Sequence, residues 1–300
     1  MSGIGLIGLG AMGLPIARRI LESSLRVHAH DVNAAAMAAA HEYGAIAADD
    51  IAAVAANCNL VLVSMSAEKA LTEVVDELLA HLSASAIIVD IGTTAVAQTR
   101  VLAARAAALG IGYIDAPVSG SVPWAEQGRL TMMVGGAQED YQRCRPVFET
   151  FARQIFYLGG SGSGQIVKLC HQLVFFALTC SLSEGLAMAT QEGVARDKVL
   201  AAIDASVAPN HAMEFLLPAV AQGNFRGADM QIAGKDMAAV LALAKHLEFD
   251  APLATQVSKY FHTFIARNQV DYNLFGLLDL IADEGFSRNC DTERNGRGFR

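Results

Sequence analysis

The clearest fold signal in the chain is the stretch Ile4-Gly5-Leu6-Ile7-Gly8-Leu9-Gly10-Ala11-Met12-Gly13. Its first four residues predict a short buried strand, and the apolar residues that follow over 14–21 predict a helix. The glycines between them have the spacing GxGxxG. In this pattern the first glycine allows a tight turn, the second lets the backbone approach a pyrophosphate, and the third lets the helix pack closely on the strand. A second strand is expected over 25–30, ending at Asp31. We therefore predict a dinucleotide-binding unit whose cofactor contacts come from Gly8, Leu9, Gly10, Ala11, Met12 and Gly13.

Asp31 lies where the acid that binds the cofactor ribose belongs. Its carboxylate can accept hydrogen bonds from the ribose hydroxyls and would repel a 2′-phosphate. The next residues, Val32 and Asn33, provide no arginine to hold such a phosphate. The sequence therefore favours NAD over NADP. Another interpretation stays open, in which Asp31 only caps the helix that begins near Asn33.

Strand and helix patterns continue to alternate through the first half of the chain, with strands expected over 60–65, 87–90 and 113–116. This alternation predicts an α/β fold with a Rossmann-type, doubly wound parallel sheet. Ligands bind at the carboxyl ends of such strands, so Met65 and Thr93 are expected to line the cofactor pocket. Thr93 could also be the N-cap of the next helix.

The segment Ser119-Gly120-Ser121 follows a strand that Pro117 interrupts. It can form a loop of N–H and hydroxyl donors, which could hold a carboxylate or could be a solvated turn. Farther along, the glycine run at 159–162 indicates a domain boundary. We expect a nucleotide-binding domain over 1–162, an all-helical domain over 163–286 that contains a helix over 235–247, and a polar tail over 287–300.

A long helix is expected from Gly164 onward, with Lys168 and Gln172 four residues apart on one face. The helix then becomes strongly apolar, so most of its sides should be buried. Burial disfavours the charged form of an amine, which would let a lysine act as a base near neutral pH. An ordinary lysine that extends its ammonium to water is the alternative.

Composition limits the partners and the compartment. The net charge is −8, which argues against nucleic acid and anionic membranes. Five dispersed cysteines suggest free thiols in a reducing cytoplasm and no metal site. Strand-like sequence begins at Ile4, which leaves no room for a signal peptide. The apolar run over 173–189 contains Ser181, Ser183 and Glu184, so we do not expect it to span a membrane.

Four motifs in this order resemble the β-hydroxyacid dehydrogenase family, which includes the 3-hydroxyisobutyrate dehydrogenases. The resemblance covers roughly residues 3–260. The motifs are Gly8 through Gly13, Asp115 through Gly120, Gly164 through Gln172, and Lys235-Asp236. The resemblance implies that Ser119 and Gly120 bind the substrate carboxylate, that Lys168 is the general acid/base, and that Thr93 and Lys235 lie near the cofactor.

Two departures from the family pattern bear on the substrate. The family usually has Ser-Gly-Gly where this chain has Ser121 as the third residue, which adds a side chain near the expected substrate. It often has two asparagines where this chain has His171-Gln172. The Lys-x-x-His-Gln form is similar to the L-threonate dehydrogenase-like branch. His171 could line the substrate pocket or could be a core or interface histidine.

The sequence therefore predicts an oxidoreductase that transfers hydride between NAD and a small anionic 3-hydroxy acid. Candidate substrates are L-threonate or a related four-carbon sugar acid, 3-hydroxyisobutyrate, and glycerate with tartronate semialdehyde. Ser119, Gly120, Ser121, Gln172 and His171 are the expected substrate contacts. The alternatives are an NADP-dependent semialdehyde reductase, an imine reductase, an oxidative decarboxylase and a non-catalytic dinucleotide sensor. A homodimer or homotetramer is expected because the apolar helical domain cannot easily bury its helices alone.

Overall fold

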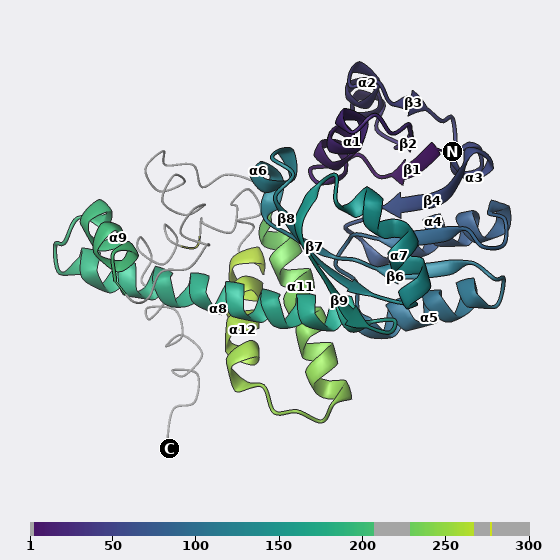
Figure 1. The fold of residues 1–300 in the computed structure, drawn as a ribbon. Helices are drawn as coiled ribbons and strands as arrows, with labels where there is room; N and C mark the ends of the chain where they lie inside the picture. Colours follow the sequence, from purple (N-terminus) through teal and green to yellow (C-terminus); the bar gives the residue numbers. More distant parts are fainter. Residues whose placement is uncertain (1–2, 207–228, 267–276, 278–300) are drawn as a thin grey trace. The chain divides into compact units, whose positions relative to one another are not determined.

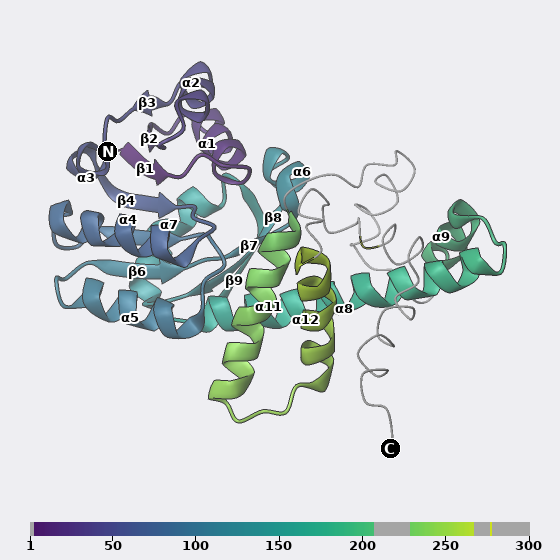
Figure 2. The same ribbon diagram turned by 180° about the vertical axis from the view of Figure 1, so that it is seen from behind.

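The computed structural model describes residues 3–206, 229–266 and 277. It divides into two compact units, Met1–Cys170 and His171–Arg300. The long helix α8 (Ser163–Gln191) carries residues of both units. The predicted tail at 287–300 lies outside the described residues. Figures 1 and 2 show the chain from opposite sides.

Unit 1 contains a nine-stranded sheet in the order β3-β2-β1-β4-β5-β6-β8-β7, with β9 paired to β8. All pairs from β3 to β6 are parallel, which confirms the doubly wound core. The sheet becomes antiparallel where β6 and β7 pair with β8, and β9 is again parallel to β8. The strands are β1 Gly3–Ile7, β2 Val27–His30, β3 Ile46–Ala47, β4 Cys58–Val63, β5 Ile87–Asp90, β6 Gly112–Asp115, β7 Val118–Ser119, β8 Leu130–Gly135 and β9 Ala152–Gly159.

Helices separate the strands and form a hydrophobic core with each face of the sheet. Strand β4 contributes to both cores: Leu62 belongs to one, and Val61 and Val63 belong to the other. A strand buried on both faces is apolar along its length, as residues 60–63 of β4 are. The helices of this unit are α1 Gly13–Glu22, α2 Ala34–Glu42, α3 Ile51–Asn57, α4 Glu68–His81, α5 Val96–Ala107, α6 Ser121–Glu126 and α7 Gln138–Phe148.

The described part of unit 2 is helical, as the sequence predicts. It contains most of α8, together with α9 (Arg196–Asp204), α11 (Asp229–His246) and α12 (Pro252–Ala266). Helices α11 and α12 run side by side in both views (Figures 1 and 2). Helix α11 begins six residues before the predicted start at Lys235, so Lys235 lies inside the helix and not at its N-terminus.

Helix α8 is the one helix among the described residues that is long and apolar enough to cross a membrane. Length and composition alone give this result, and central helices of soluble proteins pass the same test. Several polar side chains of α8 are buried, among them Gln165, Lys168 and Gln172. We therefore keep the expectation that this helix does not span a membrane.

Candidate active site

The glycine loop between β1 and α1 has the geometry that its spacing predicts. Gly8 has φ +91°, and a Cβ there would lie 2.3 Å from the carbonyl oxygen of Ser64. A Cβ at Gly13 would lie 1.9 Å from the carbonyl oxygen of Gly8. At Gly10, in contrast, no heavy atom lies within 4 Å of such a Cβ. Two glycines are therefore required by close packing, and the middle one leaves open space beside the loop.

This open space lies beside the first turn of α1. The N-cap residue, Met12, makes no side-chain hydrogen bond to that turn. Free N–H groups at a helix N-terminus attract an anion, and a pyrophosphate is the anion that the loop pattern predicts. The residues present therefore fit a dinucleotide.

Asp31 binds the glycine loop directly. Its Oδ2 accepts a hydrogen bond from the Leu9 N–H at 2.6 Å, and its Oδ1 accepts one from the Asn33 N–H at 2.7 Å. The side chain that caps α2 is that of Asn33, which accepts from the Ala35 N–H at 3.0 Å. The interpretation of Asp31 as a helix cap is therefore wrong. Each of its oxygens retains a further lone pair that could accept from a ribose hydroxyl.

Met65 and Thr93 follow β4 and β5 at the carboxyl edge of the sheet. The loops that carry them are in close contact, because a Cβ at Gly92 would lie only 2.6 Å from the carbonyl oxygen of Met65. Thr93 is half-buried. It does not cap α5, since the N-cap position belongs to Ala95.

Ser119, Gly120 and Ser121 form a turn between two short elements and not an open loop. Ser119 ends β7, and Ser121 begins α6. Gly120 has φ +134°, and a Cβ there would lie 2.8 Å from the Trp124 side chain. Ser121 has φ +56°, a left-handed conformation that is uncommon for residues other than glycine. The backbone thus keeps, at Ser121, a conformation that suits the glycine usual in the family.

The first turn of α8 is anchored by Asp115, the last residue of β6. Its two carboxylate oxygens accept from the backbone N–H groups of Gly162 at 2.8 Å and Gln165 at 3.0 Å. Burial raises the pKa of the Asp115 carboxyl, although these N–H groups act in the opposite direction. Lys168 follows one turn later, and only 6% of it is exposed. The structure therefore places the predicted general acid/base in a buried position.

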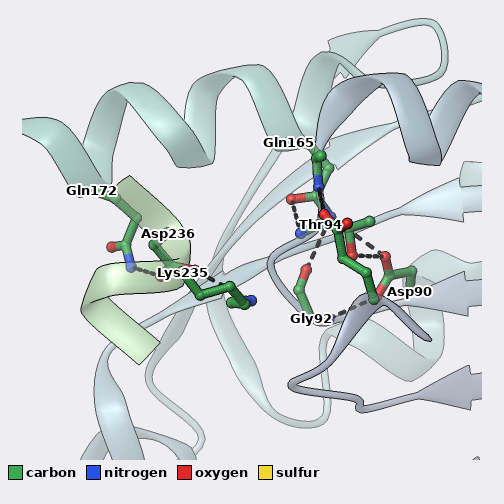
Figure 3. A network of polar contacts seen from close by, with 9 residues as sticks. Asp90, Gly92, Thr94, Gln165, Gln172, Lys235 and Asp236 are labelled. Carbon is green, nitrogen blue, oxygen red and sulfur yellow. Dashed lines mark hydrogen bonds and ion pairs between the residues drawn. The ribbon is translucent and has the colours of Figure 1, made fainter. Parts of the chain in front are cut away.

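Gln172, His171 and Lys235 belong to unit 2, where Asp236 connects two of them (Figure 3). The Gln172 Nε2 donates to the Asp236 Oδ2 at 2.5 Å, and the Lys235 Nζ lies 3.2 Å from the Asp236 Oδ1. His171 Nδ1 is 3.1 Å from the Gln172 Oε1, and its ring stacks on Phe175. Sequence reasoning had not assigned a role to Asp236.

Three further residues were missed in unit 1: Asp90, Thr94 and Gln165. All three are buried and joined by hydrogen bonds (Figure 3). One signal was available in the sequence, because Asp90 and Asp115 are acids at the ends of otherwise apolar strands. No group of three or more His, Cys, Asp or Glu side chains among the described residues is arranged to hold a metal ion.

Two family models match consecutive parts of the chain. Residues 3–159 match the family model described as the NAD-binding domain of 6-phosphogluconate dehydrogenase. Residues 162–279 match the model described as NAD-binding of NADP-dependent 3-hydroxyisobutyrate dehydrogenase. Together the two models span most of the chain, in the order that the sequence motifs predict.

Two relatives and one solved structure extend this similarity. The chain is 31% identical to 2-(hydroxymethyl)glutarate dehydrogenase of Eubacterium barkeri, over 86% of this chain and 87% of the relative. It is 30% identical to 3-hydroxyisobutyrate dehydrogenase of Pseudomonas aeruginosa, over 87% and 91%. The crystal structure of 3-hydroxyisobutyrate dehydrogenase from Salmonella typhimurium has the same fold, with a TM-score of 0.87, 24% identity, and coverage of 93% of this chain and 100% of that one. The chain therefore belongs to the 3-hydroxyisobutyrate dehydrogenase-like family of NAD(P)-dependent hydroxyacid dehydrogenases.

Proposed function

We propose that this protein catalyses reversible hydride transfer between NAD and the alcohol of a small 3-hydroxy carboxylic acid, with Lys168 as the general acid/base. The observation that carries the proposal is the buried position of Lys168, one turn from the Asp115 anchor on the helix that follows the nucleotide-binding sheet. A buried amine is neutralised more easily than an exposed one, and a neutral amine can accept a proton.

Each residue then has a role in the reaction. In the oxidation direction Lys168 accepts the hydroxyl proton as the C–H hydride leaves, and in the reduction direction it returns that proton. The bound nicotinamide supplies or accepts the hydride. Ser119, Gly120 and Ser121 hold the substrate carboxylate. Gln172 and His171 are further substrate-binding residues.

The names of the two relatives support a hydroxymethyl acid as substrate. In both 3-hydroxyisobutyrate and 2-(hydroxymethyl)glutarate, the carbon that bears the carboxylate also bears a CH₂OH group. We place these compounds first in a panel that also contains L-threonate and glycerate. We keep the four-carbon sugar acids in the panel because the His171-Gln172 pair is similar to the form found in the L-threonate dehydrogenase-like branch.

Asp31 supports NAD as the cofactor. A carboxylate at the ribose position would repel a 2′-phosphate, and both of its oxygens are already fixed by backbone N–H groups. The alternative is an NADP-dependent semialdehyde reductase, the cofactor type named in the second family model. Activity with NADP alone would overturn the assignment to NAD.

We also propose a cytoplasmic homodimer or homotetramer. Apolar side chains of α8, including Val174 and Met188, are exposed in the single chain. Burial of such surface between copies would stabilise an assembly. Light scattering after size exclusion would refute the assembly if the mass were near the 31.7 kDa of one chain.

The test of the function is a panel of hydroxy acids with each cofactor, followed by absorbance of the reduced nicotinamide. We expect wild-type turnover with NAD and a loss of about 10²–10⁴-fold in kcat for Lys168→Ala. Lys69→Ala is the matched control, because Lys69 is exposed on α4 and pairs only loosely with Glu73 at 3.7 Å. Near-wild-type turnover by a folded Lys168→Ala protein would overturn the role of Lys168. Cofactor binding without turnover of any acid would favour the alternative of a non-catalytic dinucleotide sensor.

A further inference from the structure

The loop that carries Thr93 is held from both sides by one side chain, that of Gln165. The Gln165 Oε1 accepts from the Thr94 N–H at 3.1 Å, and its Nε2 donates to the Gly92 carbonyl oxygen at 2.9 Å (Figure 3). These two partners are the residues immediately before and after Thr93. Gln165 is fully buried, so its amide has no water to exchange with and both ends are satisfied by the loop.

A second contact set fixes the same loop from the strand beneath it. Asp90, the last residue of β5, accepts from the Gly92 N–H at 2.9 Å through Oδ1 and from the Thr94 hydroxyl at 2.8 Å through Oδ2. Gln165 Nε2 also lies 3.5 Å from the Asp90 Oδ2. The loop backbone around Thr93 is therefore determined by one carboxylate and one amide, both buried.

Gln165 is itself held in place by the neighbouring strand. Its backbone N–H donates to the Asp115 Oδ2 at 3.0 Å. Asp90 and Asp115 are register partners at the ends of the parallel strands β5 and β6. Gln165 therefore joins two adjacent strand ends, one through its backbone and the other through its side chain.

The same residue lies one helical turn before Lys168 on α8. Residues three apart in a helix are neighbours on its surface. A displacement of Gln165 would therefore disturb the Thr93 loop and the turn that carries Lys168 together. We propose that Gln165 is a positioning residue of the hydride-transfer site: it fixes the Thr93 loop, which we expect to contact the cofactor, relative to the start of α8. This inference rests on the proposed function.

The test compares Gln165→Met with Gln98→Met. Methionine has a similar length and cannot form the two amide hydrogen bonds. Gln98 is a matched control, because its Nε2 also links two elements, donating to the Thr72 hydroxyl at 2.8 Å, and this hydrogen bond does not involve the Thr93 loop. In the absence of cofactor, we expect hydrogen exchange of the Thr94 amide to be at least about tenfold faster in Gln165→Met, because its acceptor is lost.

Cofactor binding and steady-state kinetics provide the second readout. We expect the Kd for the reduced cofactor to rise about tenfold in Gln165→Met, with kcat reduced. The KM for the hydroxy acid should stay within about twofold of wild type, because Ser119 and Gly120 are not part of this network. A general loss of structure would raise the cofactor Kd and the KM for the hydroxy acid together and would lower the melting temperature. Gln98→Met should change neither the cofactor Kd nor the KM for the acid.

Gln165→Glu keeps the inference testable if the methionine variant does not fold. It retains an acceptor for the Thr94 N–H and, when ionised, loses the donor to the Gly92 carbonyl. We expect intermediate cofactor affinity with Thr94 still protected from exchange. The inference is overturned if a folded Gln165 variant matches Gln98→Met in Thr94 exchange and cofactor Kd. A wild-type protein that binds no dinucleotide would instead refute the proposed function, which is a distinguishable result.

Discussion

Gln172 on α8 donates its side-chain amide to the buried carboxylate of Asp236 on α11, with 2.5 Å between Nε2 and Oδ2. Because an amide oxygen only accepts, the 3.1 Å contact at its other end makes His171 Nδ1 the donor. The length of the glutamine, one methylene more than asparagine, is therefore used to reach Asp236. The departure from the asparagine usual in the family is part of a hydrogen-bonded pair and not an isolated change.

Shortening the Gln172 side chain should break its hydrogen bond to Asp236. Gln172→Asn withdraws the amide and leaves one oxygen of a buried carboxylate without its donor. We expect the free energy of unfolding to fall by about 1–3 kcal/mol. The KM for the hydroxy acid should rise, since the amide would no longer be held in one orientation. Urea denaturation and steady-state kinetics measure the two effects.

A double-mutant cycle with Asp236→Ala provides the control. If the two residues act through their mutual hydrogen bond, the second substitution should cost less in the presence of the first. The Lys235–Asp236 ion pair cancels in the cycle, because Asp236→Ala removes it both with and without Gln172→Asn. Additive effects would show that the hydrogen bond between Gln172 and Asp236 does not stabilise the protein.

A substitution at Ser121 should affect substrate binding without destabilising the protein. It has φ +56°, which is unfavourable for a side chain by about 1–2 kcal/mol in this region, although glycine increases the entropy of the unfolded chain. Ser121→Gly should therefore leave the free energy of unfolding unchanged or raise it by about 1 kcal/mol. If the hydroxyl holds the substrate carboxylate, the KM for the acid rises severalfold. An unchanged KM in a stable variant would remove Ser121 from the substrate contacts.

The cysteines should differ sharply in their reaction with thiol reagents. Burial raises the pKa of the Cys58, Cys144 and Cys180 thiols to about 12, and Cys170 is exposed. Only the thiolate reacts, and a raised pKa keeps these three groups protonated up to high pH. We expect iodoacetamide at pH 8 to label Cys170 alone among these four, with no increase at the other three by pH 9.5. Peptide mass spectrometry, with urea-unfolded protein as the control, measures the labelling.

The fold of unit 1 could be predicted because its signals are local. The glycine spacing requires close backbone contacts at Gly8 and Gly13. A run of apolar residues such as 60–63 in β4 occurs where both faces of a strand are buried. Several of the elements that sequence reasoning did not predict are short or polar. Strands β3 and β7 have two residues each, and α7 contains Pro146 and few apolar residues. Such segments lack the periodicity on which prediction depends.

The hydrogen-bonded part of the site could not be predicted for a different reason. Gln165 lies 71 to 75 residues from its partners Thr94, Gly92 and Asp90. Asp236 lies 64 residues from Gln172. A polar residue that is buried and one that is exposed look alike in a single sequence, and only the fold shows which carboxylate faces which donor. The motifs predict roles for Ser119, Gly120 and Lys168, whereas the hydrogen bonds made by Gln165 and Asp236 are seen only in the folded chain.

Gly10 and Gly13 provide a test of cofactor binding that separates folding from ligand contact. A Cβ at Gly13 would lie 1.9 Å from the Gly8 carbonyl oxygen, so Gly13→Ala must displace backbone and should lower the free energy of unfolding by about 1–3 kcal/mol. A Cβ at Gly10 meets no protein atom, so Gly10→Ala should leave unfolding unchanged. Its methyl group would instead occupy the space expected for the pyrophosphate, so we expect cofactor affinity to fall at least about tenfold. Thermal unfolding without ligand and titration with the reduced cofactor measure the two quantities. If Gly10→Ala bound the cofactor as tightly as wild type, the pyrophosphate would have to lie elsewhere, and the assignment of this loop would be wrong.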